Sequence, residues 1–126
     1  MKKILIVDDE EVIGRVLKLH LERTGRYDVR VEQKGMQGYP AALEFLPDLI
    51  ILDIVMPDLV GSAVAYQLRA DKRTQNIPII FWSGLVTPGD HKRQIGDIGN
   101  STILPKPIPI ADVVSCINSK LEIASP

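Results

Sequence analysis

The fold is decided by residues 48–58, which read Asp48-Leu49-Ile50-Ile51-Leu52-Asp53-Ile54-Val55-Met56-Pro57-Asp58. The four apolar residues that precede Asp53 are typical of a strand buried on both faces of a parallel sheet. Because proline has no N–H to give to a neighbouring strand, Pro57 ends this strand near Asp53. We therefore expect Asp53 at the carboxyl end of a central strand, where open α/β sheets bind ligands. On this stretch alone, a helix cap or a solvated loop acid remains an alternative interpretation.

Length and composition predict one globular domain over residues 1–126, with 45% hydrophobic residues, enough to build a full core. The formal net charge is −1, from 15 basic and 16 acidic residues, so the sequence gives no reason to expect binding to nucleic acid or to an anionic membrane. No apolar run approaches the roughly 18 residues that span a bilayer. Cys116 is the only cysteine, which excludes an internal disulfide. We expect a cytoplasmic protein.

Strand and helix patterns alternate along the whole chain. Apolar runs predict further strands over residues 3–7, 27–31, 76–84 and 101–104. Apolar residues at helical spacing predict a first helix with Asp9 as a possible N-cap, ending at Gly25, and a short second helix that begins beside Pro40. A third helix is expected over residues 63–70 with Ser62 as N-cap, a glycine-weakened fourth after Pro88, and a last one from Ile110. Five such units predict a flavodoxin-like, doubly wound, five-stranded parallel sheet flanked by five helices.

Polar residues stand where the predicted strands end. They are Asp8 and Asp9 after the first strand, Asp53 after the third, Ser83 after the fourth and Lys106 after the fifth. Carboxylates about 5 Å apart repel by roughly 3 kcal/mol at an effective dielectric of 20, so a cluster of three favours a hard divalent cation such as Mg²⁺. A metal ion, an ammonium and a hydroxyl around one carboxylate meet the needs of phosphoryl transfer, with Asp53 as nucleophile.

At this point the sequence resembles the receiver domains of two-component response regulators. The resemblance rests on Asp8-Asp9, on Asp53 with Met56-Pro57 and Gly61, on Ser83-Gly84 and on Lys106-Pro107, in the right order over the whole chain. It implies a non-enzymatic signalling switch, in which Asp53 accepts phosphate from a phosphohistidine on a sensor histidine kinase or phosphotransfer protein and the change is passed to a downstream effector or output domain.

The resemblance also implies a role for each site residue. Asp9, Asp53 and the Val55 carbonyl would bind Mg²⁺ directly, and Asp8 would act through water. Ser83 and Lys106 would contact the phosphoryl oxygens.

The sequence departs from the family pattern at the aromatic position three residues before the lysine. Ile103 stands there, so we expect phosphorylation to act mainly on the loop and glycine-weakened helix that follow Ser83. By the same resemblance, Val55 and Leu85 flank the path of the water that removes the phosphate. Both are apolar, which predicts a persistent phosphorylated state.

Two other functions are weighed against the switch. A Mg²⁺-dependent phosphatase with an aspartyl nucleophile would need a second acid two residues after Asp53, where this chain has Val55. A flavodoxin-like cofactor binder would need a phosphate-binding loop after the first strand, where this chain has acids. Because the sequence ends after the last predicted helix, we expect either a stand-alone receiver or the front end of a longer protein.

Overall fold

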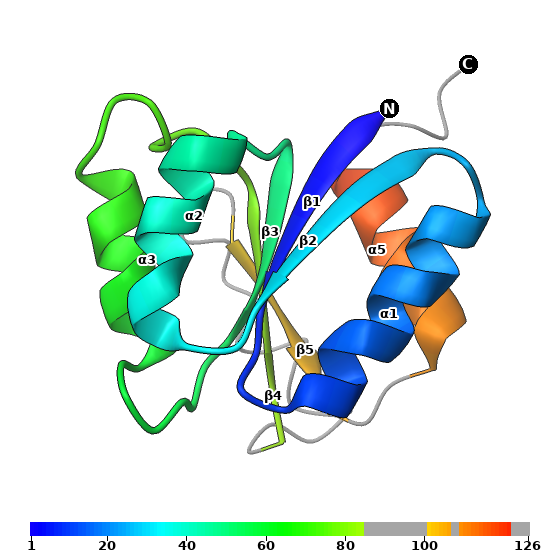
Figure 1. The fold of residues 1–126 in the computed structure, drawn as a ribbon, viewed down its shortest axis with the longest axis horizontal. Helices are drawn as coiled ribbons and strands as arrows, with labels where there is room; N and C mark the ends of the chain where they lie inside the picture. The colour runs from blue at the N-terminus through cyan, green and yellow to red at the C-terminus, as the bar shows by residue number, and fades with distance from the viewer. Residues whose placement is uncertain (85–100, 107–108, 122–126) are drawn as a thin grey trace.

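The computed structural model describes residues 1–84, 101–106 and 109–121. Within these residues one parallel sheet is formed in the strand order β2-β1-β3-β4-β5 (Figure 1). The strands are β1 (Lys2–Val7), β2 (Tyr27–Glu32), β3 (Leu49–Asp53), β4 (Ile79–Ser83) and β5 (Ser101–Pro105). The expected flavodoxin-like, doubly wound sheet is confirmed, and its boundaries differ from the predicted ones most at β4, which begins after Pro78 rather than at Asn76.

Helices cover both faces of the sheet. In Figure 1, α1 (Glu11–Arg23) and α5 (Ile110–Leu121) lie on one side, and α2 (Gly38–Phe45) and α3 (Gly61–Arg69) lie on the other. A short 3₁₀ helix, η1 (Gly35–Gln37), precedes α2. The helix expected after Pro88 lies outside the described residues.

The alternation of side chains along the buried strands builds two cores. On β3, Leu49 and Ile51 pack against α1 and α5, whereas Ile50 and Leu52 pack against α2 and α3. All four are fully buried, as a strand with two covered faces requires. This explains why an uninterrupted apolar run, and not an alternating one, precedes Asp53.

The predicted start of the third helix is wrong. α3 begins at Gly61 with Val60 as its N-cap and without a side-chain cap, so Ser62 is not the cap. The Gly61 N–H donates to the Ile54 carbonyl at 2.8 Å, and a Cβ on Gly61 would lie 2.4 Å from the Asp53 carbonyl oxygen. The helix start is therefore fixed by close packing against the end of β3, which no capping pattern reveals.

The starts of α1 and α2 also differ from the sequence patterns. Glu10, not Asp9, occupies the N-cap position of α1, and it makes no side-chain cap hydrogen bond. Instead the Asp8 carboxylate accepts the Glu10 N–H at 2.8 Å. α2 begins at Gly38, two residues before Pro40, which still falls in the first turn where a missing N–H costs little.

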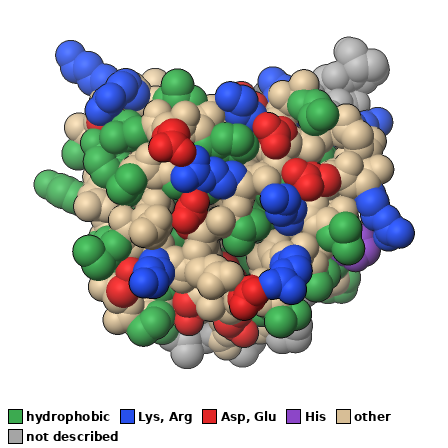
Figure 2. Space-filling model, in the orientation of Figure 1, with side chains coloured by type: hydrophobic (Ala, Val, Ile, Leu, Met, Phe, Trp, Pro, Cys, Tyr) green, Lys and Arg blue, Asp and Glu red, His purple; other side chains and the backbone are tan. Residues whose placement is uncertain are grey.

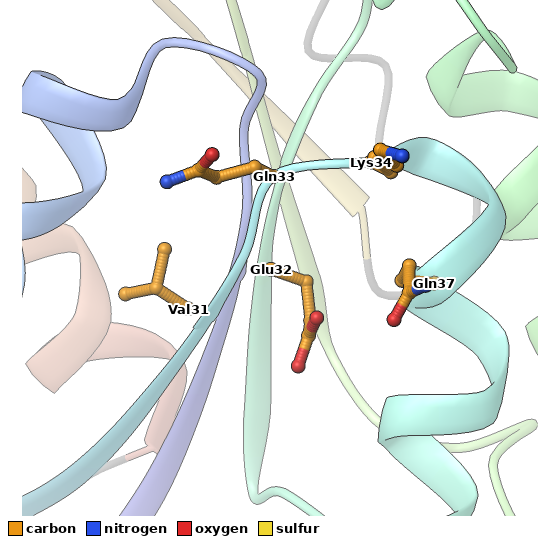
Figure 3. Close-up of a pocket in the computed structure, with 5 residues that line it drawn as sticks. All are labelled: Val31, Glu32, Gln33, Lys34 and Gln37. Atoms are coloured by element: carbon orange, nitrogen blue, oxygen red, sulfur yellow. The ribbon is translucent and has the colours of Figure 1, made fainter.

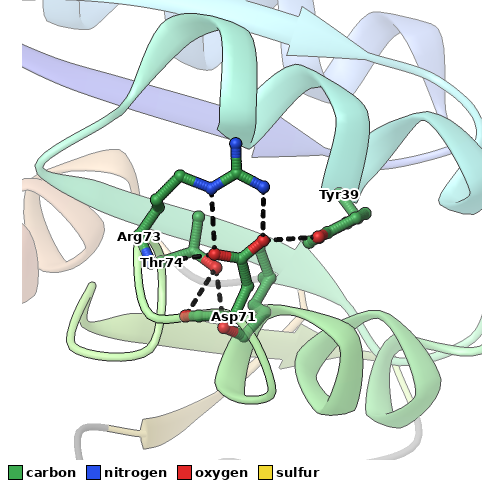
Figure 4. A network of polar contacts seen from close by, with 5 residues as sticks. Tyr39, Asp71, Arg73 and Thr74 are labelled. Atoms are coloured by element: carbon green, nitrogen blue, oxygen red, sulfur yellow. Dashed lines mark hydrogen bonds and ion pairs between the residues drawn. The ribbon is translucent and has the colours of Figure 1, made fainter.

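A polar network joins α2 to the segment that follows α3 (Figure 4). The Tyr39 hydroxyl donates to the Asp71 carboxylate at 2.6 Å, and the Arg73 guanidinium donates to the same carboxylate at 2.8 and 3.1 Å. The Thr74 hydroxyl donates to the Leu68 carbonyl at 2.7 Å. The bonds from Arg73 and Tyr39 hold the pKa of Asp71 well below its usual range. The network fixes the chain reversal between α3 and β4.

The surface mixes charges of both signs. On the face shown in Figure 2, acidic and basic side chains alternate between smaller apolar areas. Among the described helices, none combines the length and the apolar character that crossing a bilayer requires.

Candidate functional site

Three carboxylates come together at the carboxyl ends of β1 and β3. Asp8 follows β1 and is fully buried, Glu10 precedes α1, and Asp53 ends β3 with 4% of its surface exposed. Oxygen atoms from these three side chains lie within 4.8 Å of one another. The parallel pairing of Val7 with Leu52 aligns the ends of the two strands, and so brings acids 45 residues apart in the sequence to one edge.

The Lys106 ammonium lies among these acids. Its Nζ is 2.7 Å from Asp8 Oδ2, 2.9 Å from Glu10 Oε1 and 3.5 Å from Asp53 Oδ2. Only 10% of the Lys106 side chain is exposed. The backbone fixes its position, because the Lys106 N–H donates to the Ser83 carbonyl at 3.0 Å and so continues the pairing of β4 with β5.

The remaining predicted site residues lie around this group. Ser83 is buried at the end of β4, where it pairs with Pro105 of β5. Asp9 is exposed, and its carboxyl group contributes to raising the pKa of Asp53. Val55 is half exposed, and its N–H lies 3.4 Å from Asp53 Oδ1. The structure therefore gathers every residue of the predicted site at one edge of the sheet.

Sequence reasoning did not assign two neighbours of Lys106 to the site. Glu10 is an acid next to the expected pair, and the geometry places it, rather than Asp9, in the group of three. Trp82 is buried in the core, and its ring also lies 4.9 Å from Lys106 Nζ, measured to the ring centroid. Only the run of acids after β1 signalled Glu10, and nothing in the sequence signalled the contact with Trp82.

Burial and neighbouring acids change the ionisation of the site. Burial above all, then the carboxyl group of Asp9 and the charge of Asp8, raise the pKa of Asp53 to about 7, against a smaller opposing effect of Lys106. Burial alone would lower the pKa of Lys106, but its contacts with Asp8 and Glu10 outweigh burial and raise it. The site is therefore a fixed cation beside acids that are costly to ionise together.

The donor set fits a hard divalent cation. The three acidic side chains that converge offer carboxylate oxygens, which are the ligands that Mg²⁺ prefers. Asp8 Oδ2 is buried and accepts no hydrogen bond from the described part of the chain, although it is at ion-pair distance from Lys106. A buried carboxylate oxygen whose only compensation is a neighbouring positive charge is well suited to act as a metal ligand.

A separate hollow of ≈ 300 Å³ lies at the carboxyl end of β2 (Figure 3). It is lined by Val31, Glu32, Gln33, Lys34 and Gln37. The Glu32 carboxylate is already paired with Arg30 at 2.8 Å. The hollow shares no lining residue with the acid cluster and offers no comparable set of ligands.

Comparison with known families shows to which family the chain belongs. The family described as the response regulator receiver domain matches residues 4–118. The chain is a response regulator receiver domain. It is thus a phosphoryl-accepting switch of two-component signalling, as the motifs at the strand ends indicated, rather than the phosphatase or the cofactor binder.

Relatives of this receiver domain differ in length. It is 35% identical to the DNA-binding dual master transcriptional regulator RpaA of Synechocystis, over 96% of this chain and 49% of that protein. It is 30% identical to the polar-differentiation response regulator DivK of Brucella ovis, over 95% of this chain and 96% of that protein. The chain spans about half the length of the first curated relatives that it matches.

Solved receiver domains share the fold. The receiver domain of the sensor histidine kinase PA1611 from Pseudomonas aeruginosa, solved with a magnesium ion in its active-site cleft, has a TM-score of 0.80 and 27% identity, covering 96% of this chain and 98% of that one. A Francisella response regulator receiver domain has a TM-score of 0.81 and 26% identity, covering 99% and 100%.

Proposed function

We propose that Asp53 is the phosphoacceptor of this receiver domain. One observation carries this assignment: the Asp53 carboxylate ends the central strand, is almost buried, and lies 3.5 Å from the Lys106 ammonium and beside Asp8. A buried acid surrounded by other acids is energetically unfavourable unless an incoming group or ion uses it. Family membership supplies the class of reaction, and the geometry supports this residue.

In the proposed step, an Asp53 carboxylate oxygen attacks the phosphorus of a phosphohistidine. A P–O bond forms to Asp53 as the P–N bond breaks, and the imidazole leaves as the neutral base after taking up a proton. Lys106 neutralises charge on a phosphoryl oxygen, and Ser83 supplies a hydroxyl at the neighbouring strand end. The fixed backbone of β3, β4 and β5 holds these three residues in place, so little reorganisation is needed during transfer.

We further propose that Asp8, Asp53 and one or both of Asp9 and Glu10 hold Mg²⁺, with the Val55 carbonyl as an additional ligand. When bound, the ion would neutralise phosphoryl oxygens and favour the ionised form of Asp53. The proximity of Asp8, Glu10 and Asp53 supports this set, and the magnesium-bound receiver domain of PA1611 is a structural relative.

The proposed phosphodonor is a sensor histidine kinase or a histidine phosphotransfer protein, and the proposed target is a downstream protein or an output domain. Relatives of both kinds support this range, since RpaA is a DNA-binding regulator and DivK matches nearly end to end. We further propose that the chain has a signalling rather than an enzymatic role and acts in the cytoplasm.

The test is phosphorylation by acetyl phosphate with Mg²⁺, followed by intact-mass measurement. The wild type should gain one phosphoryl group, and Asp53→Ala or the presence of EDTA should abolish the gain. Asp58→Asn is the matched control, because Asp58 lies five residues further on and bonds to the N–H groups of Gly35 and Met36, outside the cluster. A phosphoryl adduct that persists in Asp53→Ala would overturn the assignment.

A further inference from the structure

Trp82 lies between the phosphoacceptor strand and the lysine strand. It is the fourth residue of β4, where its backbone pairs with Asp53 of β3 and with Leu104 of β5. Its carbonyl accepts the Ile54 N–H at 3.1 Å. The side chain is 3% exposed and belongs to the core cluster beneath α1 and α5. The indole is therefore a fixed wall of the site rather than a mobile surface ring.

The Lys106 ammonium lies against this ring. The distance of 4.9 Å from Nζ to the ring centroid is within the range of a cation–π contact. The Trp82 indole N–H, in contrast, is buried and finds no hydrogen-bond partner in the described part of the chain. An aliphatic residue would fill this core position without burying an unpaired donor, so packing alone does not explain an indole here. The contact with the ammonium does.

The ring differs from the other partners of the ammonium in one respect. Those partners are Asp8, Glu10 and Asp53, which are the carboxylates of the candidate metal site. These carboxylates can pair with the ammonium or bind a divalent cation. The neutral ring attracts the ammonium but is not a ligand for Mg²⁺. The ring is thus a partner of Lys106 that does not depend on how the carboxylates are used.

We infer that Trp82 is a positioning residue that holds the Lys106 ammonium at the transfer site through the face of its ring. The inference rests on the proposed role of Asp53 and Lys106 in phosphoryl transfer. It predicts that Lys106 stays near the ring when Mg²⁺ is present, and that phosphoryl transfer slows when the ring is removed.

The test combines NMR with kinetics. In protein carrying ¹³C-labelled lysine, the Lys106 ε-CH₂ signal, assigned by its loss in Lys106→Arg, should show an upfield ring-current shift with and without Mg²⁺. The shift should be lost in Trp82→Leu and retained in part in Trp82→Phe. Phosphorylation by acetyl phosphate should slow about tenfold in Trp82→Leu and less in Trp82→Phe.

Ile80→Val is the matched control, because Ile80 lies two residues earlier on the same strand in the same core cluster. It should change neither the shift nor the rate. The inference is overturned if the wild-type shift disappears on addition of Mg²⁺, or if Trp82→Leu loses the shift but is phosphorylated at the wild-type rate. If Trp82→Leu does not fold, the same two measurements are made on Trp82→Phe. A reduced ring-current shift with a phosphorylation rate equal to that of the wild type would then overturn the inference. A wild type that is never phosphorylated would defeat the proposed function, and the NMR shift would still report whether the ring holds Lys106.

Discussion

Replacing Asp53 by asparagine should stabilise the protein in the absence of metal, and the gain should grow with pH. Asp53 is 4% exposed, and its burial, with help from Asp9 and Asp8, raises its pKa from 3.8 to about 7. Asparagine has nearly the same shape but never carries the charge. The variant therefore lacks the cost of ionising a carboxyl group inside this cluster.

The size of the effect follows from linkage. A rise in pKa from 3.8 to about 7 corresponds to about 4 kcal/mol, at 1.36 kcal/mol per pKa unit. This value already includes the attraction of Lys106. Because the native state holds the Asp53 proton more tightly, the contribution of Asp53 to wild-type stability is highest below pH 4 and is lost as the pH rises from about 4 to about 7. The advantage of Asp53→Asn should accordingly increase by about 2–3 kcal/mol between pH 5 and pH 8.

Urea unfolding in EDTA at pH 5, 6.5 and 8 measures this difference. Asp28→Asn is the control, since Asp28 is an exposed acid on β2 and its replacement should have a small effect at every pH. Adding Mg²⁺ should then stabilise the wild type more than Asp53→Asn, because the proposed metal site uses the Asp53 carboxylate of the native state. The reasoning is refuted if Asp53→Asn is less stable than the wild type at pH 8, or if its advantage is the same at pH 5 and pH 8.

Three further changes test other parts of the structure. Gly61→Ala should lower the free energy of unfolding by about 1–3 kcal/mol, because the new Cβ would lie 2.4 Å from the Asp53 carbonyl oxygen, and an unchanged urea midpoint would contradict this. Asp71→Asn should weaken the protein at neutral pH, since hydrogen bonds from Arg73 hold the pKa of Asp71 well below its ordinary 3.8. The stability advantage of the wild type over Asp71→Asn should be constant above about pH 5 and should shrink as the pH falls below 3.8. Equal differences in melting temperature between the two proteins at pH 7 and at pH 3 would count against this role of Asp71. Val55→Asn should speed loss of the phosphate about tenfold, because an amide beside Asp53 would orient the attacking water, and a phosphate lifetime equal to that of the wild type would exclude this role.

The strands could be predicted from the sequence because their signal is local. The run from Leu49 to Leu52 is apolar at every position, and burial on two faces is the arrangement that satisfies it. The polar residues at the strand ends were equally visible, since parallel strands bring their carboxyl ends to one edge. The chain carries these signals within a few consecutive residues.

The helix starts and the inner geometry of the site depend on contacts between distant segments. Gly61 begins α3 because of the backbone of Asp53 and Ile54, which capping rules applied to Ser62 cannot include. The choice of Glu10 over Asp9 in the acid group depends on where each side chain points once α1 has formed. Leu85, which was expected to flank the site with Val55, and the segment expected to respond to phosphorylation lie outside the described residues.

Glu10 and Lys106 are separated by 96 positions along the chain, yet their side chains meet. A nascent chain emerging from the ribosome completes β1 and β3, and with them the acids, long before it delivers β5 and the balancing ammonium. The same is true of a chain whose last strand has frayed from the sheet. Such partly folded forms hold the acids without the Lys106 ammonium, and we expect them to accept phosphate poorly if Lys106 has the proposed role. With the proposed roles of Asp53 and Lys106, phosphoryl transfer would therefore require that β5 has joined the sheet.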